Sequence, residues 1–430
     1  MPADFIDSYY SRSLSAAEAA PYPALRGVVE AEVCVVGGGM AGLATALGLA
    51  ERGVSVVLLE SQRLGWGASG RNGGFVSPGY ATSSERLIGQ VGEAGACELY
   101  RLTQDAYDLI RARIARYEIG CGPVEGLIRL SWFGAEKAFK EEAAFMAEHT
   151  GEVFEYWPED KVAAHYASPR YRDGLFQPKA MHLNSLKLCL GTARAAVGQG
   201  ARIFEDSAVI CLEKRGEGRR VVTAAGRVDC DQVVLCGSAY LGGLDKRVER
   251  ATLPVYTFVM LTEPLGKRLA SAIRAPYGVH DDRFALDYYR PLPDTRLLWG
   301  GRISMLPPPR DLKAAMLGDL LKVYPQLAGV EAEVAWSGTM AYATHKMPQI
   351  GEIEPGLWVC SAFGGHGMCA TTAGGEIIAK AIAEGDETYR LFAPFGLDYA
   401  GGILRPALVQ GAYWYYELRD WLKSPRSKSS

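Results

Sequence analysis

The chain has 430 residues, of which 48% are hydrophobic, and a net charge of −3 at pH 7. This length exceeds one small core, so two domains are expected, and the near-neutral charge gives no electrostatic reason to bind nucleic acid. No stretch approaches the roughly 18 uncharged apolar residues of a membrane span. Residues 1–23 lack the features of a signal peptide, and the nine cysteines have no C-x-x-C spacing, so we expect reduced thiols and a cytoplasmic location.

The first predicted elements surround a glycine-rich turn. A buried strand over 33–36 runs into Gly37, Gly39 and Gly42, and residues 41–52 have helical spacing. Such glycines leave unhindered backbone amides at a helix N-terminus, where a pyrophosphate can bind. The pattern therefore predicts a dinucleotide site, and the alternative is an ordinary βαβ unit that holds no ligand.

A second strand and an irregular loop complete this region. The strand over 54–59 ends at Glu60, whose carboxylate can accept hydrogen bonds from both hydroxyls of an adenosine ribose. An acid at this position argues against a 2′-phosphate. The loop over 61–75 is rich in glycine and can press its backbone against a large planar ligand. Its polar groups include Ser69, Arg71 and Asn72.

The middle of the chain alternates helical and strand patterns. The predicted helices cover 84–118, 135–148 and a segment from a cap at Asn184 or Ser185 to residue 198. The predicted strands cover 201–204, a hairpin of 219–224 with 227–229 around Ala225-Gly226, and a buried strand over 232–236. Residues 251–325 are expected to build the sheet of a second domain.

The loop over 61–75 is similar to that of the glycine/D-amino-acid oxidase (DAO) family of FAD enzymes. The likeness is greatest to the γ-glutamylputrescine oxidase branch, which carries nearly the same Gly-Ala-Ser-Gly-Arg-Asn-Gly-Gly run as residues 67–74. Nearly the whole chain takes part in the resemblance. Further similar segments are 8–10, 287–290, 296–302, 336–351, 362–368 and 411–420.

The resemblance implies an α/β fold. It consists of a Rossmann-like FAD-binding domain (GR2-type, the DAO fold) and a second, α+β substrate domain built on an antiparallel sheet. We expect a discontinuous FAD-binding domain of 28–90, 150–248 and 326–390, a substrate domain of 91–149 and 249–325, and a C-terminal extension over 391–430. The extension contains an aromatic helix over 414–421, for which packing on its own protein is favoured over a membrane-surface role.

FAD is the implied cofactor. The segment from 206 to 211 resembles the family segment whose backbone, at Val209, pairs with the adenine edge. Relatives that tether the flavin use a cysteine within 336–348, where this chain has none, so FAD is expected to be non-covalent. Cys360 and Cys369 flank the glycine loop and are the cysteines to examine for a covalent bond. No metal is expected. The predicted cofactor-binding residues are Gly37, Gly39, Met40, Gly42, Glu60, Ser61, Arg63, Gly67, Ala68, Ser69, Arg71, Asn72, Gly73, Val209, Gly338, Gly364, Gly365, His366, Gly367 and Met368.

The run Gly364-Gly-His-Gly367 precedes a predicted helix over 370–383. Amides or a helix N-terminus aimed at the N1 and C2 carbonyl side of an isoalloxazine stabilise its reduced form. His366 is a candidate for direct contact with flavin or substrate, and the alternative is a hydrogen bond to a neighbouring carbonyl.

Substrate contacts are expected from Tyr288 and Tyr289. These residues alternate on a strand, so one should face the cavity and the other the domain core, and ordinary sheet packing of both is the alternative. With His366 they are the predicted catalytic residues. Oxidising a C–N bond requires the substrate carbon close to flavin N5 and a neutral amine, so no strong base is obligatory.

Family members that oxidise small α-amino acids carry an arginine shortly after the Trp-x-Gly position, and it clamps the substrate carboxylate. This chain has Met-Ala-Tyr-Ala-Thr-His-Lys over 340–346 and no arginine there. Glycine and sarcosine are therefore disfavoured and a longer amine is favoured. Lys346 remains a candidate for gripping a distal carboxylate.

The expected function is FAD-dependent oxidation of an amine C–N bond. A hydride passes to flavin N5, the imine is hydrolysed to aldehyde and amine, and O2 takes the electrons as hydrogen peroxide. The expected substrate is γ-glutamylputrescine or a related N-substituted amine or amino acid. Two alternatives are a dehydrogenase of the same fold that uses a quinone or carrier protein, and a partner-dependent flavoprotein that modifies a peptide side chain.

Overall fold

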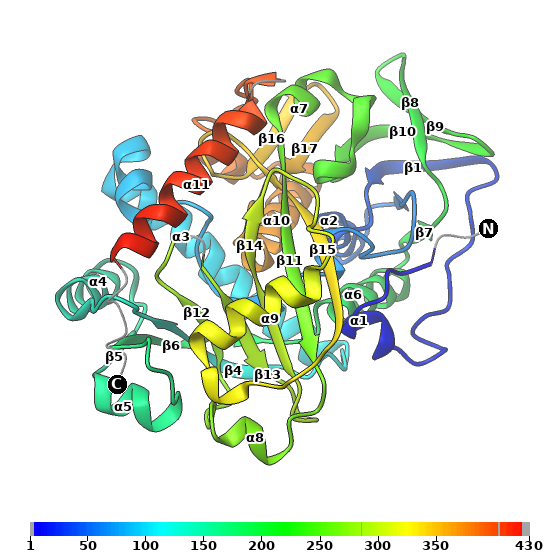
Figure 1. Ribbon diagram of the computed structural model, residues 1–430. Helices are drawn as coiled ribbons and strands as arrows, with labels where there is room; N and C mark the ends of the chain where they lie inside the picture. The colour runs from blue at the N-terminus through cyan, green and yellow to red at the C-terminus, as the bar shows by residue number, and fades with distance from the viewer. Residues whose placement is uncertain (1–3, 285, 403–404, 424–430) are drawn as a thin grey trace.

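The protein is described by a computed structural model that covers residues 4–284, 286–402 and 405–423. Its first sheet has eight strands within these ranges, in the order β16-β17-β10-β1-β2-β7, with β9 paired to β10 and β8 paired to β9 (Figure 1). All pairs from β17 to β7 are parallel. The strands are β1 (Gly27–Val36), β2 (Val56–Leu59), β7 (Arg202–Phe204), β8 (Val209–Arg215), β9 (Gly218–Thr223), β10 (Gly226–Leu235), β16 (Gln349–Glu354) and β17 (Leu357–Ser361).

Helices α2 (Met40–Ala50) and α10 (Met368–Glu384) pack against each other on this sheet. Their backbones approach closely, because a Cβ on Gly375 would lie 2.7 Å from the Cβ of Ala44. Helix α6 (Ser185–Gly198) packs beside α2, and Asn184 caps it by accepting a hydrogen bond from Lys187 N at 3.0 Å. Residues 33–36 of β1 and all of β2 are buried, and both segments are apolar because parallel strands are covered on both faces.

The second sheet has nine strands in the described residues, in the order β15-β11-β14-β13-β12-β4-β6-β3, with β5 attached to β6. Its pairs are antiparallel except β12 with β4. The strands are β3 (Phe75–Val76), β4 (Val124–Leu130), β5 (Glu155–Trp157), β6 (Gly174–His182), β11 (Leu253–Thr262), β12 (Gly278–Asp281), β13 (Tyr288–Pro291), β14 (Leu297–Ser304) and β15 (Ala332–Tyr342).

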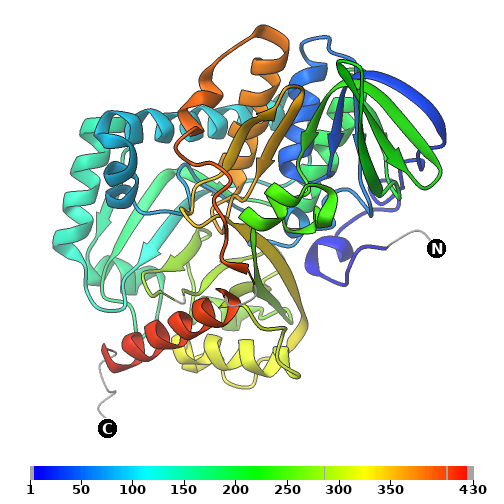
Figure 2. The ribbon, with the colours of Figure 1, turned by 90° about the horizontal axis from the view of Figure 1, so that it is seen from above.

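Helix α9 (Leu312–Val323) covers this second sheet. The core between them is aromatic, with the rings of Tyr289 and Trp299 stacked at 4.4 Å and that of Tyr324 edge-on to both. Helix α11 (Arg405–Lys423) lies on the same side of the sheet as α9 (Figures 1 and 2).

The strand pairing departs from the expected domain boundaries. The segments 28–90, 150–248 and 326–390 are expected to build the FAD-binding domain. Each of them nevertheless contributes to the second sheet: the first with β3, the second with β5 and β6, and the third with β15. Helix α3 (Ser84–Arg116), in turn, contributes Leu99, Tyr107 and Ile110 to the core of the first sheet. A strand pattern specifies which side chains are buried, but not which sheet edge the strand joins, because that depends on long-range pairing.

The remaining described helices are α1 (Tyr9–Arg12), α4 (Glu136–Thr150), α5 (Glu159–His165), α7 (Lys246–Ala251) and α8 (Lys267–Ala270), with short 3₁₀ turns. The predicted hairpin around Ala225-Gly226 is confirmed as β9 and β10. In the described ranges, no helix is long and apolar enough to cross a membrane. The tail after the aromatic helix, which carries Arg426 and Lys428, lies outside the described residues.

Candidate functional site

A cavity of about 850 Å³ lies between the two sheets. Val36, Leu59 and Cys236, at the carboxyl ends of three neighbouring parallel strands, line one side of it, and Thr257 and Tyr288 of the second sheet line the other. The carboxyl ends of parallel strands are where open α/β sheets bind ligands. The volume falls in the upper part of the range of about 300–1,000 Å³ typical of ligand pockets.

The glycine turn has the geometry that a pyrophosphate needs. Gly37 has φ 113°, and a Cβ there would lie 2.8 Å from the carbonyl group of Cys236. A Cβ on Gly39 would lie 2.9 Å from Ser69 Oγ, which accepts a hydrogen bond from Met40 N at 2.9 Å. Gly42 does not line the cavity, but its Cβ would lie 1.9 Å from Gly37 O, so it permits the close contact of turn and helix.

Glu60 closes one end of the cavity. Its Oε2 accepts a hydrogen bond from Gly38 N at 2.6 Å, and its Oε1 accepts one from Gln62 N at 2.9 Å. These bonds orient the carboxylate, which keeps lone pairs for two ribose hydroxyls. Burial raises the pKa of Glu60, while the bond from Gly38 opposes that shift. Ser61 and Val209 also line the cavity.

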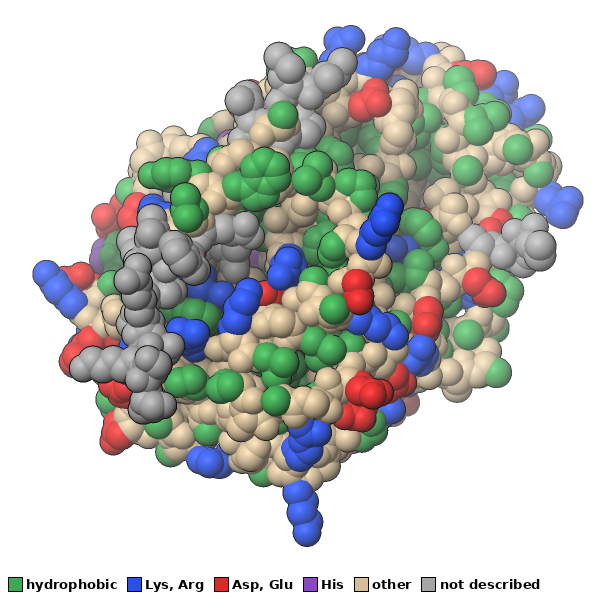
Figure 3. Space-filling view, viewed as in Figure 1, with side chains coloured by type: hydrophobic (Ala, Val, Ile, Leu, Met, Phe, Trp, Pro, Cys, Tyr) green, Lys and Arg blue, Asp and Glu red, His purple; other side chains and the backbone are tan. Residues whose placement is uncertain are grey.

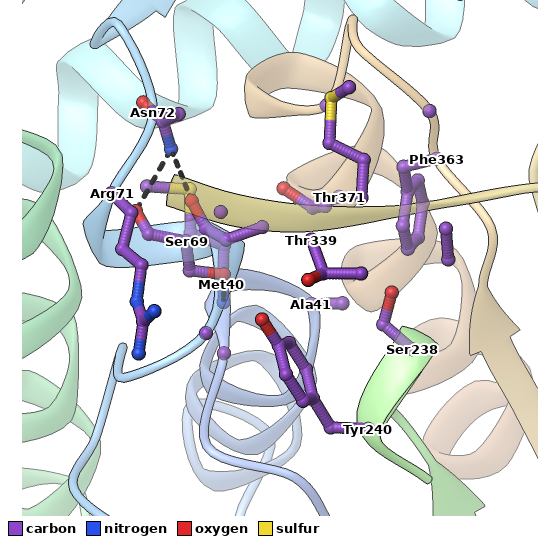
Figure 4. A pocket seen from close by; sticks show the side chains of 18 of the residues that line it. Met40, Ala41, Ser69, Arg71, Asn72, Ser238, Tyr240, Thr339, Phe363 and Thr371 are labelled. Atoms are coloured by element: carbon purple, nitrogen blue, oxygen red, sulfur yellow. Dashed lines mark hydrogen bonds between the residues drawn. The ribbon is translucent and has the colours of Figure 1, made fainter. Parts of the chain in front are cut away.

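The loop between Gly67 and Gly73 forms a wall (Figure 4). Asn72 fixes its shape, because Nδ2 donates to Ala68 O at 3.1 Å and to Ser69 O at 2.9 Å, and Oδ1 accepts from Gly74 N at 2.7 Å. Asn72 thus shapes the loop through three bonds within it. The predicted residues Gly338, Gly364, Gly365, Gly367 and Met368 line the cavity as well.

Arg71 is a buried cation in this wall. Its side chain stacks on Trp66 at 4.1 Å, Nε donates to Trp66 O at 2.5 Å, and Nη2 is buried without a hydrogen-bond partner among the described residues. No carboxylate of the described chain pairs with it. An orphaned donor of this kind fits a ligand with electron-rich oxygens or nitrogens, since an unmade bond to a buried charge is costly. The residues present therefore fit FAD.

Arg63, predicted to bind the cofactor, does not line the cavity. It is buried, with Nε 3.0 Å from Glu205 Oε2 and Nη2 donating to Ala19 O at 2.6 Å. The prediction was wrong because a polar residue next to a ligand loop in sequence can point away from it. Arg63 instead connects the N-terminal segment to the segment after β7.

The tyrosine pair separates as alternation predicts. Tyr288 lines the cavity, with its ring 5.9 Å from that of Phe75. Burial raises the pKa of Tyr288 to about 12, so its phenol is neutral at physiological pH. Tyr289 is fully buried, and its hydroxyl lies 2.6 Å from that of Tyr324. Tyr289 is thus a core residue, and its prediction as a catalytic candidate was wrong.

Two histidines also line the cavity. His366 Nε2 lies 3.1 Å from Ser77 Oγ and from Pro78 O and also faces Ser77 O, so the carbonyl contact considered as an alternative is present. His280, on β12 opposite Tyr288 of β13, was missed by the sequence reasoning. Burial lowers the pKa of both imidazoles, that of His280 to about 3, and both are neutral at physiological pH.

The buried His280 should make stability depend on pH. Its folded-state pKa of about 3 lies below the ordinary 6.5, so the unfolded chain binds more protons between these values. The free energy of unfolding therefore falls as the pH decreases through this window. We expect His280→Gln to flatten the dependence by up to about 1.4 kcal/mol per pH unit, measured by urea unfolding between pH 4.5 and 7.

The segment after Tyr342 does not supply a cation to the cavity. His345 is buried and its Nδ1 accepts a hydrogen bond from Met347 N at 3.1 Å, while Lys346 is exposed with φ 64°. Neither lines the cavity. Of the cysteines considered for covalent attachment, Cys360 lines the cavity, whereas Cys369 is buried outside it.

Several lining residues were not predicted. Figure 4 labels Ser238, Tyr240, Thr339, Phe363 and Thr371 among them. Ser238 and Tyr240 follow directly after β10, and the end of a buried parallel strand beside the glycine strand is a signal that could have indicated them. The others come from β15, the loop after β17 and α10, and only the fold brings them together.

Comparison with known proteins agrees with this geometry. A family model described as DAO, FAD dependent oxidoreductase, matches residues 32–381. The chain is 35% identical over 422 residues to gamma-glutamylputrescine oxidoreductase of Escherichia coli, covering 96% of this chain and 98% of that protein. It is 33% identical over 429 residues to the probable oxidoreductase OrdL of Haemophilus influenzae, covering 97% and 98%.

Solved structures show the same fold. L-amino acid deaminase from Proteus vulgaris has a TM-score of 0.72 and 21% identity, with 88% of this chain and 97% of that chain covered. Glycine oxidase from Bacillus cereus has a TM-score of 0.68 and 22% identity, with 84% and 97% covered. Together with the matching family model and the nucleotide-binding turn, these findings show that the protein belongs to the DAO family of FAD-dependent oxidoreductases.

Proposed function

We propose that the protein oxidises the C–N bond of an amine and that its substrate is γ-glutamylputrescine or a related N-substituted amine. The observation that carries this proposal is the 35% identity with gamma-glutamylputrescine oxidoreductase over 96% of the chain. The absence of an arginine between 340 and 346 supports it, because no guanidinium from that stretch is available to clamp an α-carboxylate.

In this proposal the substrate half of the cavity orients the amine and keeps it neutral. Its walls include Phe75, Leu127, Tyr288 and Tyr342, so a bound amine would lose water. Loss of water favours the neutral form of an amine. His280 and His366 are neutral and add no repelling charge. Water hydrolyses the imine formed by the oxidation to an aldehyde and an amine, and both leave. Bound FAD would accept a hydride from the substrate carbon, and we propose O2 as the final acceptor, with hydrogen peroxide as product.

The cavity-facing tyrosine should matter for turnover and its neighbour should not. We expect Tyr288→Ala to lower kcat/KM for the amine about 10- to 100-fold with FAD retained, because the substrate loses an aromatic wall that positions it. Tyr289→Phe is the matched control. It loses the 2.6 Å contact with Tyr324 and should lower the melting temperature, while kcat/KM stays within about twofold of the wild type. Equal losses of activity in both variants would contradict this assignment.

The proposed function is tested by anaerobic reduction of the purified holoenzyme. The protein is mixed with γ-glutamylputrescine, putrescine, glycine or sarcosine, and bleaching of the flavin band is followed. Fast bleaching by γ-glutamylputrescine with slow bleaching by glycine and sarcosine is the expected result. Air is then admitted, and fast return of the colour supports O2 as the acceptor, whereas slow return favours a quinone or carrier protein. Faster turnover of glycine or sarcosine would overturn the proposed substrate.

We also infer a reducing compartment, as in the cytoplasm. Eight of the nine cysteines are buried as free thiols and only Cys211 is exposed. Free thiols persist where thioredoxin and glutathione keep them reduced. The inference predicts that thiol titration of freshly prepared, denatured protein counts all nine thiols as free.

A further inference from the structure

Two cysteines lie side by side in the wall of the cavity. Cys236 follows directly after β10, and Cys360 belongs to β17. These parallel strands pair in a register that ends at Leu235 opposite Val359. The next residues along the two strands are Cys236 and Cys360, so their side chains point to the same face of the sheet, and both line the cavity. Neighbouring strands lie about 4.8 Å apart, which is within the range of about 4.4–6.8 Å between the Cα atoms of a disulfide.

The two thiols differ in how they can react. Figure 3 shows that the surface is hollowed in the upper half of this face, so small solutes can pass below its outer layer of side chains. Cys236 keeps 6% of its surface exposed, whereas Cys360 is fully buried. Contact with Cys236 and burial hold the pKa of the Cys360 thiol well above its usual range, so Cys360 stays protonated at physiological pH. Since the thiolate is the reactive form, an oxidant that enters the cavity reacts first with Cys236.

The cysteine pair lies between two backbone segments of the proposed FAD site. On one side, a Cβ on Gly37 of the glycine turn would lie 2.8 Å from the Cys236 carbonyl group, and Cys236 N donates to Val36 O at 2.8 Å. On the other side, a Cβ on Gly374 of α10 would lie 3.0 Å from Cys360 Sγ. A bond between the two sulfurs would bring them to about 2.05 Å, which is closer than any contact between two thiols. It would therefore shift these close-packed segments against each other.

We propose that Cys236 and Cys360 are a peroxide-sensitive thiol pair whose disulfide weakens the binding of FAD. The proposal rests on the proposed function only for the source of the oxidant, because hydrogen peroxide is the product of reoxidation by O2. The Cys236 thiolate attacks one oxygen of hydrogen peroxide, the O–O bond breaks, and the hydroxide that leaves takes up a proton to become water. The Cys360 thiol then displaces the oxygen of the Cys236 sulfenic acid as a second water, and the S–S bond forms. The two sulfurs lose two electrons in total, and the peroxide gains them.

Exposure to the cavity separates this pair from a second pair in the same sheet. Cys34 of β1 and Cys230 of β10 lie together in the core of the sheet, and burial with the neighbouring Cys230 raises the pKa of the Cys34 thiol. Neither of them lines the cavity, so we expect peroxide to spare this second pair. Occupation of the cavity by FAD should shield Cys236 as well. The disulfide is therefore expected in molecules from which FAD has dissociated.

The test exposes the holoenzyme to added hydrogen peroxide. All proteins carry Cys211→Ser, because Cys211 is exposed and would react on its own. We expect the peptide map to contain a disulfide between Cys236 and Cys360, and the Kd for FAD to rise about tenfold. Dithiothreitol should reverse both changes. An excess of free FAD should slow the loss of thiols at least about fivefold, because it keeps the cavity occupied.

Cys236→Ser should keep its flavin in peroxide, because it lacks the thiol that reacts first. Cys230→Ser is the matched control from the second pair, and it should lose flavin in peroxide as the Cys211→Ser parent does. Equal oxidation of the two pairs, or equal loss of flavin from Cys236→Ser and the parent, would overturn the proposal.

A second arm separates the thiol pair from the proposed function. It omits added peroxide and supplies γ-glutamylputrescine in air, with and without catalase. A disulfide that forms during turnover and that catalase prevents supports the reaction product as the oxidant. A holoenzyme that no amine reduces would overturn the proposed function, whereas the response of the thiol pair to added peroxide would stand.

Discussion

Gly42→Ala is expected to yield protein that lacks bound FAD. The added Cβ would lie 1.9 Å from Gly37 O, and backbone atoms cannot yield by that distance without moving the turn. Displacing the turn would move the Gly37 and Gly39 amides, which are the proposed donors to the pyrophosphate of FAD. We expect the affinity for FAD to fall at least about 100-fold, or about 2.7 kcal/mol.

The measurement is the ratio of flavin to protein absorbance after gel filtration, with far-ultraviolet circular dichroism as a check of folding. Gly89→Ala is the matched control, because a Cβ at this helical position meets nothing within 4 Å. The control should keep full flavin content and gain slightly in helix stability. A folded Gly42→Ala protein with full flavin content would contradict the assigned role of the turn.

Arg290→Met is expected to give the largest loss of stability among the variants considered. Arg290 is 3% exposed and has no acidic partner in the described residues. It donates from Nε to Gly73 O at 2.8 Å and from Nη2 to Leu183 O at 3.0 Å. Its Nη1 lies 3.3 Å from His182 Nδ1, and burial with Arg290 nearby lowers the pKa of His182 to about 3. The imidazole is therefore neutral and accepts the bond.

Removing this guanidinium leaves two buried carbonyl groups unpaired, and we expect the free energy of unfolding to fall by about 3–5 kcal/mol. FAD binding should weaken too, because Arg290 holds Gly73 at the end of the loop that is proposed to contact the cofactor. Thermal unfolding with and without added FAD measures both effects. Arg296→Met is the control, since its guanidinium is partly exposed beside Asp294 and Glu333 and should cost about 1 kcal/mol or less. Similar losses in the two variants would argue against this account of Arg290.

Local signals predicted the backbone elements around the glycine turn well. The glycine turn, Glu60, the cap at Asn184 and the hairpin at Ala225-Gly226 depend on residues close together in sequence, and the structure contains each of them. The shape of the loop between Gly67 and Gly73 also follows from local hydrogen bonds.

Long-range pairing explains the predictions that failed. Alternation could predict that one of Tyr288 and Tyr289 faces the cavity, but the choice depends on the register of β13 with β14. In that register Tyr288 lies opposite Gly300, and Tyr289 lies opposite Trp299, on which it stacks. Gly300 leaves room for the Tyr288 ring, because a Cβ there would lie 2.0 Å from it. The side chain directions of Arg63 and Arg290 depend on similarly distant partners.

The alternation of strands between the two sheets limits how the enzyme can be recombined with its relatives. In the described residues the chain passes from one sheet to the other after β2, β6, β10 and β15. Neither half is a continuous segment, so neither can be excised by one or two cuts as an autonomous unit. A chimera that transplants the substrate half of a relative needs matched junctions at all of these crossings. Altering specificity by substitutions within the cavity avoids that requirement.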